Sequence, residues 1–344
     1  MKKRLLTVIS VIIFVISASR GYTADQYEWK QNYNWKLTHE GAKDVAEDIF
    51  ANIFAKLVHE RSNGHITIDV YYMTQLGTST DQIELLQGGA VEFGIAAIGS
   101  LAAIVPEVGV LSLHYLLPAE ISKVWDFLAN SSTTAELSRI IAEHGIQILC
   151  WNTEGAHVWS MKKPINSLAD MKGVKFRTMA SQLEMASFNA YGASSTTIAF
   201  AELYSALQLG TVDGQQQNAQ GNNVLHYYEV APYYINARAS YYIDAPCCNK
   251  SFYDSLDPYI KELLAECAQE AREQLIKIVA EKDEKEARDI ARANGVTWID
   301  FNEAQRAEFA AAAPKAYGVY LEIGGKHAKE LLDMCKKDAE KYKN

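Results

Sequence analysis

The chain has little that would anchor it in a membrane, ligate a metal or carry out catalysis. Its N-terminal apolar run, Leu5–Ile16, is shorter than the roughly 20 residues that a membrane span needs. The sequence contains no CxxC pair and no cysteine–histidine spacing typical of a metal site. It also lacks GxSxG, HExxH, GxGxxG and P-loop lysine motifs. We therefore expect a protein that is not an enzyme and that holds neither a metal nor a cofactor.

The first residues have the layout of a secretory signal peptide. Lys2, Lys3 and Arg4 precede the apolar run, and small or polar residues follow as far as Ala24. We expect residues 1–24 to be removed on export. The mature chain would then be periplasmic, with no stable insertion in the membrane.

The mature chain would also be strongly acidic. Loss of the four basic residues of the signal peptide changes the formal net charge from −9 to −13. Such a surface repels nucleic acid and gives no long-range attraction for an anionic ligand. We therefore exclude nucleic acid as a partner, and we expect any carboxylate to be captured locally by a fixed arginine in a closed cleft.

The cysteines are few and odd in number for an oxidising compartment. We expect buried thiols, with room for one bridge, rather than redox chemistry. The five are Cys150, Cys247, Cys248, Cys267 and Cys335.

Alternating hydrophobic patterns predict an α/β chain. About 320 residues is long for one core and indicates two lobes. A strand–helix rhythm in the first half predicts a parallel sheet flanked by helices, and a second such series spans 174–235. The expected strands are 27–33, 65–72, 91–97 and 146–152, with a polar loop at 34–46. The expected helices are 47–64, 79–87, 124–144 and a long one at 259–294.

One stretch carries the strongest chemical signal. Arg177 ends the run MKGVKFR, and the stretch FAELYSALQLGTVDGQQQNAQ follows further along the chain. A strand ending in a guanidinium, then an amphipathic helix and an Asp-Gly turn followed by amides, is a plausible receiver for a small carboxylate. Arginine presents a planar fork of donors that matches a carboxylate two-to-two and stays charged at physiological pH.

These motifs resemble those of the solute-binding proteins of tripartite ATP-independent periplasmic (TRAP) transporters, the dicarboxylate- and sialate-binding family. KGVKFR, AELYSALQLGTVDGQ and YYEV match its most specific runs, and IGSLAAIVPEVGVLSLHYLL is similar to its cleft loop. The resemblance implies a two-lobe periplasmic binding fold of type II with a ligand cleft between the lobes and a long bracing helix. We expect residues 25–154 with 242–282 in one lobe, and 155–241 with 283–344 in the other.

The resemblance also implies a function and partners. The chain would be a monomer that captures a small organic acid and delivers it to the TRAP membrane permease subunits. Two other classes stay open, namely a ligand-binding adaptor of a sensor and, less favoured, an exported hydrolase. Ligand recovered unchanged after long incubation would distinguish a binder from an enzyme.

Several site residues follow from the family pattern. The arginine at the position of Arg177 grips the ligand carboxylate in that family. His157 stands where the family often has a second arginine, and Gln217 replaces a family asparagine. One arginine and one histidine suit one carboxylate better than two, because a second buried anion would lack a full partner. We place Ser100, Ser181 and Asn218 in the same site.

Aromatic residues near the expected cleft suggest the rest of the ligand. We expect Trp35, Trp159 and Tyr241 to line the site, with Tyr233, Tyr234 and Tyr242 nearby. Aromatic rings supply flat apolar surface, which suits a ligand with a carboxylate and a ring. The expected ligand is an aromatic or bulky monocarboxylate such as an indole or phenyl acid, and the alternatives are a C4-dicarboxylate or a sugar acid.

Overall fold

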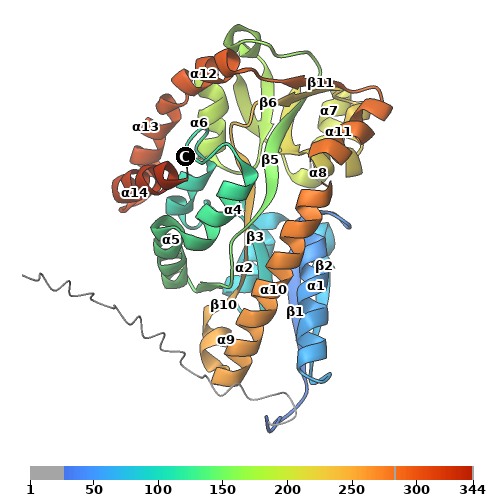
Figure 1. Ribbon diagram of the computed structural model, residues 1–344, viewed down its shortest axis with the longest axis vertical. Helices are drawn as coiled ribbons and strands as arrows, with labels where there is room; N and C mark the ends of the chain where they lie inside the picture. Colours follow the sequence, from blue (N-terminus) through green and yellow to red (C-terminus); the bar gives the residue numbers. More distant parts are fainter. Residues whose placement is uncertain (1–26, 283, 343–344) are drawn as a thin grey trace, which may run out of the picture.

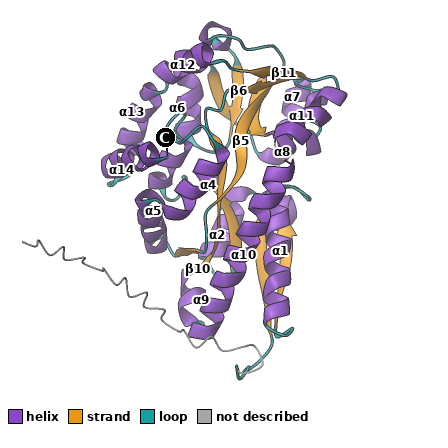
Figure 2. Ribbon diagram, viewed as in Figure 1, coloured by secondary structure: helices purple, strands orange, loops and turns teal. Residues whose placement is uncertain are grey.

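The computed structural model describes residues 27–282 and 284–342, so the expected signal peptide lies outside the described residues. The fold is mixed α/β, with a central sheet and two lobes (Figure 1). Helices lie on both sides of the strands (Figure 2). In the part of the chain that is described, no helix is long and apolar enough to cross a membrane.

Eleven strands form the sheet in the order β2-β1-β3-β10-β5-β8-β6-β7, with β4, β9 and β11 attached at its sides. The strands are β1 Tyr33–His39, β2 Ile66–Tyr72, β3 Phe93–Ala97, β4 Ile146–Ile148, β5 Asn152–Met161, β6 Lys175–Thr178, β7 Ser194–Thr197, β8 Gly214–Asn218, β9 Tyr233–Asn236, β10 Tyr241–Asn249 and β11 Thr297–Asp300.

The helices are α1 Ala46–Arg61, α2 Ser79–Gln87, α3 Ile98–Leu101, α4 Ile121–Asn130, α5 Ser132–Glu143, α6 Gln182–Ala190, α7 Leu203–Leu209, α8 Ala219–Val224, α9 Lys250–Ser255, α10 Pro258–Lys282, α11 Glu284–Ala293, α12 Glu303–Ala312, α13 Pro314–Ile323 and α14 Ala328–Lys341.

Two strands connect the two halves of the sheet. β10 pairs antiparallel with β3 on one side and with β5 on the other. β5 continues into the second half, where it pairs with β8 and β9. The parallel strands β1, β2 and β3 lie on one side of this crossing and β6, β7 and β8 on the other. Loops at the crossing are therefore brought together from both halves.

The first strand does not lie where the sequence predicts it. The expected strand at 27–33 is wrong, and the expected loop at 34–46 begins too early, because β1 is Tyr33–His39 and the loop covers only 40–45. Both segments alternate in hydrophobicity, but only the second lies between β2 and β3 and pairs with each. The expected helix at 124–144 is two helices, because Ser131 is extended (φ −79°, ψ 150°) and caps α5 by accepting from the Thr134 amide.

The long charged helix is confirmed, although it is divided. Its first part, α10, packs its apolar face against α1 in one core cluster. Arg272 of α10 is buried and donates to the carbonyl oxygens of Trp151 and Trp125 at 3.0 and 2.8 Å. The second part, α11, contacts α8, where the Asn223 side chain donates to the Ala287 carbonyl oxygen at 2.7 Å. Together α10 and α11 brace both halves of the sheet.

The cysteines are all free thiols. Cys247, Cys248, Cys267 and Cys335 are buried, and Cys150 is partly exposed. Within the described residues there is no disulfide bridge. The four buried cysteines agree with the expectation of buried thiols.

Candidate functional site

A cavity of about 320 Å³ lies where the two halves of the sheet meet. Its walls come from the loop between β1 and α1, the start of α2, the middle of β5, the ends of β6 and β8, the loop after β7, and β10. We call Arg177, His157 and Gln217 the arginine wall, and Glu40, Glu47 and Glu154 the carboxylate wall. All six side chains line the cavity.

Arg177 is the cation of the arginine wall. It lies on β6, which pairs with β7 and β8, and only 5% of the residue is exposed. Its Nε donates to the carbonyl oxygen of Ile198 at 2.9 Å, which fixes the plane of the guanidinium. Among the described residues, the two terminal nitrogens make no hydrogen bond. Burial lowers the pKa of Arg177, but an arginine keeps its charge through such a shift. The guanidinium therefore has donors left for a ligand.

His157 on the arginine wall is neutral. Its Nδ1 lies 2.9 Å from the Ser240 hydroxyl, and the residue is 7% exposed. Burial, helped by the nearby His114, lowers the pKa of His157 to about 3. Burial removes water from the charged form, and no carboxylate compensates here. His157 therefore offers a ligand a polar ring but no positive charge.

The hydroxyl of one tyrosine, Tyr242, lies between two acids of the carboxylate wall. The Tyr242 hydroxyl lies 3.2 Å from Glu40 Oε1 and 2.9 Å from Glu47 Oε1, and Ser100 donates to Glu40 Oε2 at 2.9 Å. Burial, followed by repulsion from Glu47, raises the pKa of Glu40 to about 7. Gly41 allows this approach, because a Cβ there would come within 2.3 Å of Glu47 Oε2. The wall is thus acidic and closely packed.

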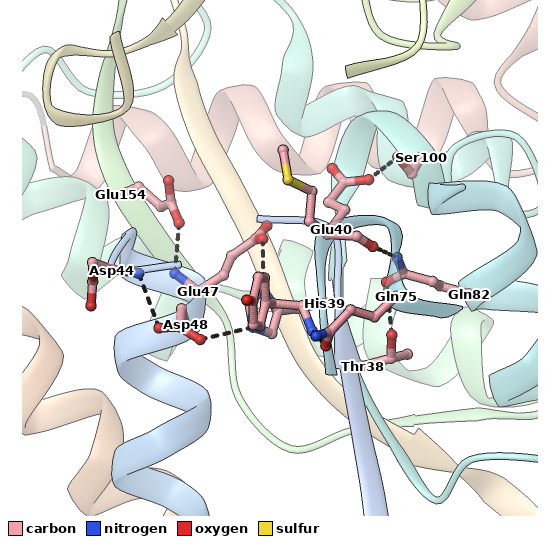
Figure 3. A network of polar contacts seen from close by, with 12 residues as sticks. Thr38, His39, Glu40, Asp44, Glu47, Asp48, Gln75, Gln82, Ser100 and Glu154 are labelled. Carbon is pink, nitrogen blue, oxygen red and sulfur yellow. Dashed lines mark hydrogen bonds and ion pairs between the residues drawn. The ribbon is translucent and has the colours of Figure 1, made fainter. Parts of the chain in front are cut away.

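A charged histidine stands behind the carboxylate wall (Figure 3). His39 Nδ1 lies 3.6 Å from Glu47 Oε2, and His39 Nε2 lies 3.4 Å from Asp48 Oδ1. Burial alone would lower the pKa of His39, but the contacts with Asp48 and Glu47 outweigh it and raise the pKa to about 9. His39 is therefore protonated at neutral pH and partly balances the acids in front of it.

The structure brings four of the expected site residues to the cavity and leaves five outside its walls. Arg177, His157, Gln217 and Ser100 line it. Ser181 and Asn218 instead cap helices, accepting hydrogen bonds from the amides of Glu184 and Gly221.

The aromatic residues are placed differently from the expectation. Trp159 shares a face of β5 with His157, but it lies further into the second lobe, where Phe188 packs on it at 5.4 Å between ring centroids. Trp35 lies on β1 and packs against Phe252 at 5.1 Å. Both tryptophans belong to apolar cores instead of the cavity wall.

Tyr241 is also directed elsewhere, since its hydroxyl donates to the Pro118 carbonyl oxygen at 2.8 Å. The rings that do line the cavity are those of Phe200 and Tyr242.

The acidic residues of the cavity were missed by sequence reasoning. Glu40 and Glu47 lie in and just after the segment expected to be a polar loop, and Glu47 occupies the first turn of α1, where an acid favours the helix dipole. Glu154 and Glu184 come from β5 and α6 and line the same cavity. The available signal was the pair His39-Glu40 inside an alternating run, which the shifted strand assignment concealed.

Comparison with known proteins places the chain in a family. Residues 37–322 match the bacterial extracellular solute-binding protein family 7. The ectoine-binding periplasmic protein TeaA of Halomonas elongata is 28% identical over 337 residues, which cover 97% of this chain and 96% of TeaA. The structure of that ectoine-binding protein aligns with a TM-score of 0.86 over 90% of this chain and 99% of the other.

Two further solved structures are similar over nearly the same length. A TRAP solute-binding protein from Desulfovibrio salexigens with bound orotic acid is 26% identical, with a TM-score of 0.85 over 90% of this chain and all (100%) of the other. One from Sulfitobacter sp. NAS-14.1 with bound β-D-galacturonate is 25% identical, with a TM-score of 0.83 over 88% and 99%. These relatives are binding proteins of TRAP transporters and not enzymes. The chain therefore belongs to the family 7 bacterial extracellular solute-binding proteins, the solute-binding proteins of TRAP transporters.

Proposed function

We propose that this protein captures a small organic acid by clamping one carboxylate on Arg177 and delivers it to a TRAP membrane permease. The observation that carries the proposal is the state of Arg177, which is buried in the cavity wall with two terminal nitrogens unpaired among the described residues. Burial lowers the pKa of Arg177 more than the nearby Glu184 and Glu40 raise it. Neither acid hydrogen-bonds to Arg177, and buried donors without acceptors are costly. A ligand carboxylate would satisfy these donors bidentately. Export to the periplasm, as a monomer, belongs to the same proposal.

A single carboxylate fits this cavity better than two. His157 is neutral and so provides no second cation, and it stands at the position where the family often has a second arginine. The cavity is also lined by Glu40, Glu47 and Glu154, which repel a second anion when ionised and offer it no positive charge when protonated. We therefore favour a monocarboxylate over a C4-dicarboxylate.

The body of the ligand is proposed to be aromatic or bulky, such as an indole or phenyl acid. Phe200 and Tyr242 offer ring surfaces, and Met73, Met179 and Leu225 extend the apolar lining. Fewer aromatic rings line the cavity than the sequence predicts, because Trp35 and Trp159 lie in the apolar cores. A sugar acid is the alternative, and a relative with bound galacturonate belongs to the same fold.

A second candidate is an acid that also carries a positively charged nitrogen. The specific observation is the carboxylate wall, where Glu40 and Glu47 share the hydroxyl of one tyrosine, Tyr242. An organic cation placed there would pair with these acids while its carboxylate reached Arg177. TeaA of Halomonas elongata, a relative with 28% identity, is named for binding ectoine.

A thermal-shift screen of small acids tests these proposals. A ligand that binds only the folded state raises the melting temperature. The panel contains indole and phenyl acids, C4-dicarboxylates, hexuronates, and each aryl acid paired with its amino-acid counterpart. We expect the aryl monocarboxylates to give the largest shift. A larger shift from the amino acids would favour the second candidate, and a dominant shift from dicarboxylates or uronates would contradict the proposed ligand class.

A further inference from the structure

Three carboxylates from distant parts of the chain converge beside the cavity. Glu47 lies in the first turn of α1, Glu154 on β5 and Asp244 on β10. One carboxylate oxygen from each lies within 4.8 Å of those of the other two. The pairing of β5 with β10 holds the second and third residues close, since Asp244 is opposite Asn152 in the ladder. The group is therefore built by the sheet crossing and does not depend on a loose loop.

These acids have few partners of their own. Glu47 Oε2 and Asp244 Oδ1 are buried, and no described residue hydrogen-bonds to either oxygen. Glu47 and Asp244 are 2% and 1% exposed. Glu154 is better supplied, because it accepts from the Glu47 amide at 2.9 Å (Figure 3) and from the Asn218 side chain. Two buried carboxylate oxygens are thus left without a hydrogen-bond donor.

The nearest cation does not balance the group. His39 contacts Glu47 at 3.6 Å but also contacts Asp48 at 3.4 Å, so one positive charge is shared by two acids. Arg177 lies on the other wall of the cavity, with no ion pair to any of the three carboxylates. Three ionised carboxylates buried together are costly unless a further cation occupies the group. Glu47 and Glu154 also line the cavity, which gives an ion an entry path.

The number and type of the donors favour one kind of cation. Calcium binds oxygen ligands at about 2.3–2.6 Å, so two ligands of one ion can be separated by up to about 5 Å. The carboxylate oxygens of this group all lie within 4.8 Å of one another, which is compatible with that span. Magnesium usually keeps several of its waters and is held by only one or two protein carboxylates, so a group of three carboxylates favours calcium. A set made only of carboxylate oxygens suits a hard cation and not zinc or copper.

We propose that Glu47, Glu154 and Asp244 bind a calcium ion beside the organic-acid cavity. Calcium takes six to eight oxygens, and the carboxylates together with water from the cavity can supply them. Because the three ligands come from α1 and from both crossing strands, the ion would tie these elements together. The proposal does not depend on the identity of the organic acid.

The test uses the whole mature protein, freed of metal with a chelator and without any organic acid. Calcium chloride at about 1 mM should raise the melting temperature by about 2–4 °C, and the same concentration of magnesium chloride should raise it less. Asp244→Asn and Glu154→Gln should each abolish the calcium shift. Glu107→Gln changes another buried carboxyl, outside the group, and should keep the full shift.

Isothermal titration with calcium chloride gives the stoichiometry directly, with one ion per chain expected. No calcium-dependent shift and no titration heat would overturn the proposal, as would an unchanged shift in both variants. If Asp244→Asn does not fold, Glu154→Gln decides the outcome, because Glu154 borders the cavity. Stabilisation by an amino acid in the screen without any response to calcium would assign the acids to the organic ligand and contradict a metal site.

Discussion

The two sides of the cavity each contain a buried histidine, and the two histidines are in opposite charge states. His39 is 0% exposed between Glu47 and Asp48, and its pKa is raised to about 9. His157 is 7% exposed beside Ser240, and its pKa is lowered to about 3. Burial acts on both in the same direction. The difference comes from the neighbours, because two carboxylates reverse the effect of burial and a hydroxyl does not.

The two walls of the cavity differ in charge in the same way. His39 is a fixed cation that supports the acids of the carboxylate wall. His157 leaves Arg177 as the only permanent cation on the arginine wall. We propose that a ligand meets one strong anion receptor and, across the cavity, a set of acids that disfavour further negative charge. On this proposal, the charge of the ligand is selected as much by repulsion from the acids as by attraction to Arg177.

The largest expected effect is the loss of the charged histidine. His39→Gln removes the cation shared by Glu47 and Asp48 and should destabilise the fold by about 3–5 kcal/mol, since it leaves buried acids uncompensated. His157→Gln is the matched control, because a neutral side chain with one hydrogen bond is replaced by another polar group. Urea unfolding at pH 7 compares the two. Equal losses of stability would mean that the charge of His39 does not matter.

The stability difference between the parent and His39→Gln should depend on pH. The folded pKa of His39, about 9, is above its value of 6.5 without perturbation. Its contribution is therefore fully present below pH 6.5 and is lost as the pH rises to 9 and above. The stability gap between the parent and His39→Gln should narrow over that range in denaturant titrations. A constant gap from pH 6.5 to 9 would show that the raised pKa is wrong.

The smallest expected effect is a change of shape. The carboxylate wall and the arginine wall come mainly from different halves of the sheet, so a ligand that touches both should draw them together. We propose the lobes as residues 25–154 with 242–282 and 155–241 with 283–344. Small-angle scattering should show a smaller radius of gyration at saturation with ligand than without it. An identical radius in both states, from an open ligand-free form, would argue against closure.

Much of the fold could be predicted because local signals agree with tertiary pairing. The expected helix at 79–87 coincides with α2, where Thr78 accepts from the Asp81 amide and so caps the first turn. The prediction of the first strand failed because two neighbouring segments both alternate in hydrophobicity. Only pairing with β2 and β3 distinguishes the second segment from the first. Helix α4 ends before Ser131 because that residue is extended and caps α5, and hydrophobic periodicity does not contain this signal.

The site was predictable only where a motif marked it. Arg177 could be found because the surrounding run is specific, and the structure places it on the cavity wall. The assignment of Trp159 to the site was wrong. Trp159 shares a face of β5 with His157, but at its position along the strand that face is covered by an apolar core of the second lobe, which sequence spacing does not reveal. Glu47 and Asp244 lie almost two hundred positions apart, at 47 and 244, and nothing local indicates that their carboxylates meet. Long-range convergence of acids is therefore the part that sequence reasoning could not supply.

The central claim is that Arg177 holds the ligand carboxylate, and calorimetry on folded variants tests it most directly. With the acid that gives the largest thermal shift, Arg177→Ala should weaken binding by about 2–5 kcal/mol, and Arg177→Lys should recover only part of the loss because the planar fork is gone. Arg139→Ala, which removes an exposed arginine paired with Glu136, should bind as the parent does. A dissociation constant for Arg177→Ala within about threefold of the parent, less than 1 kcal/mol, would contradict the account.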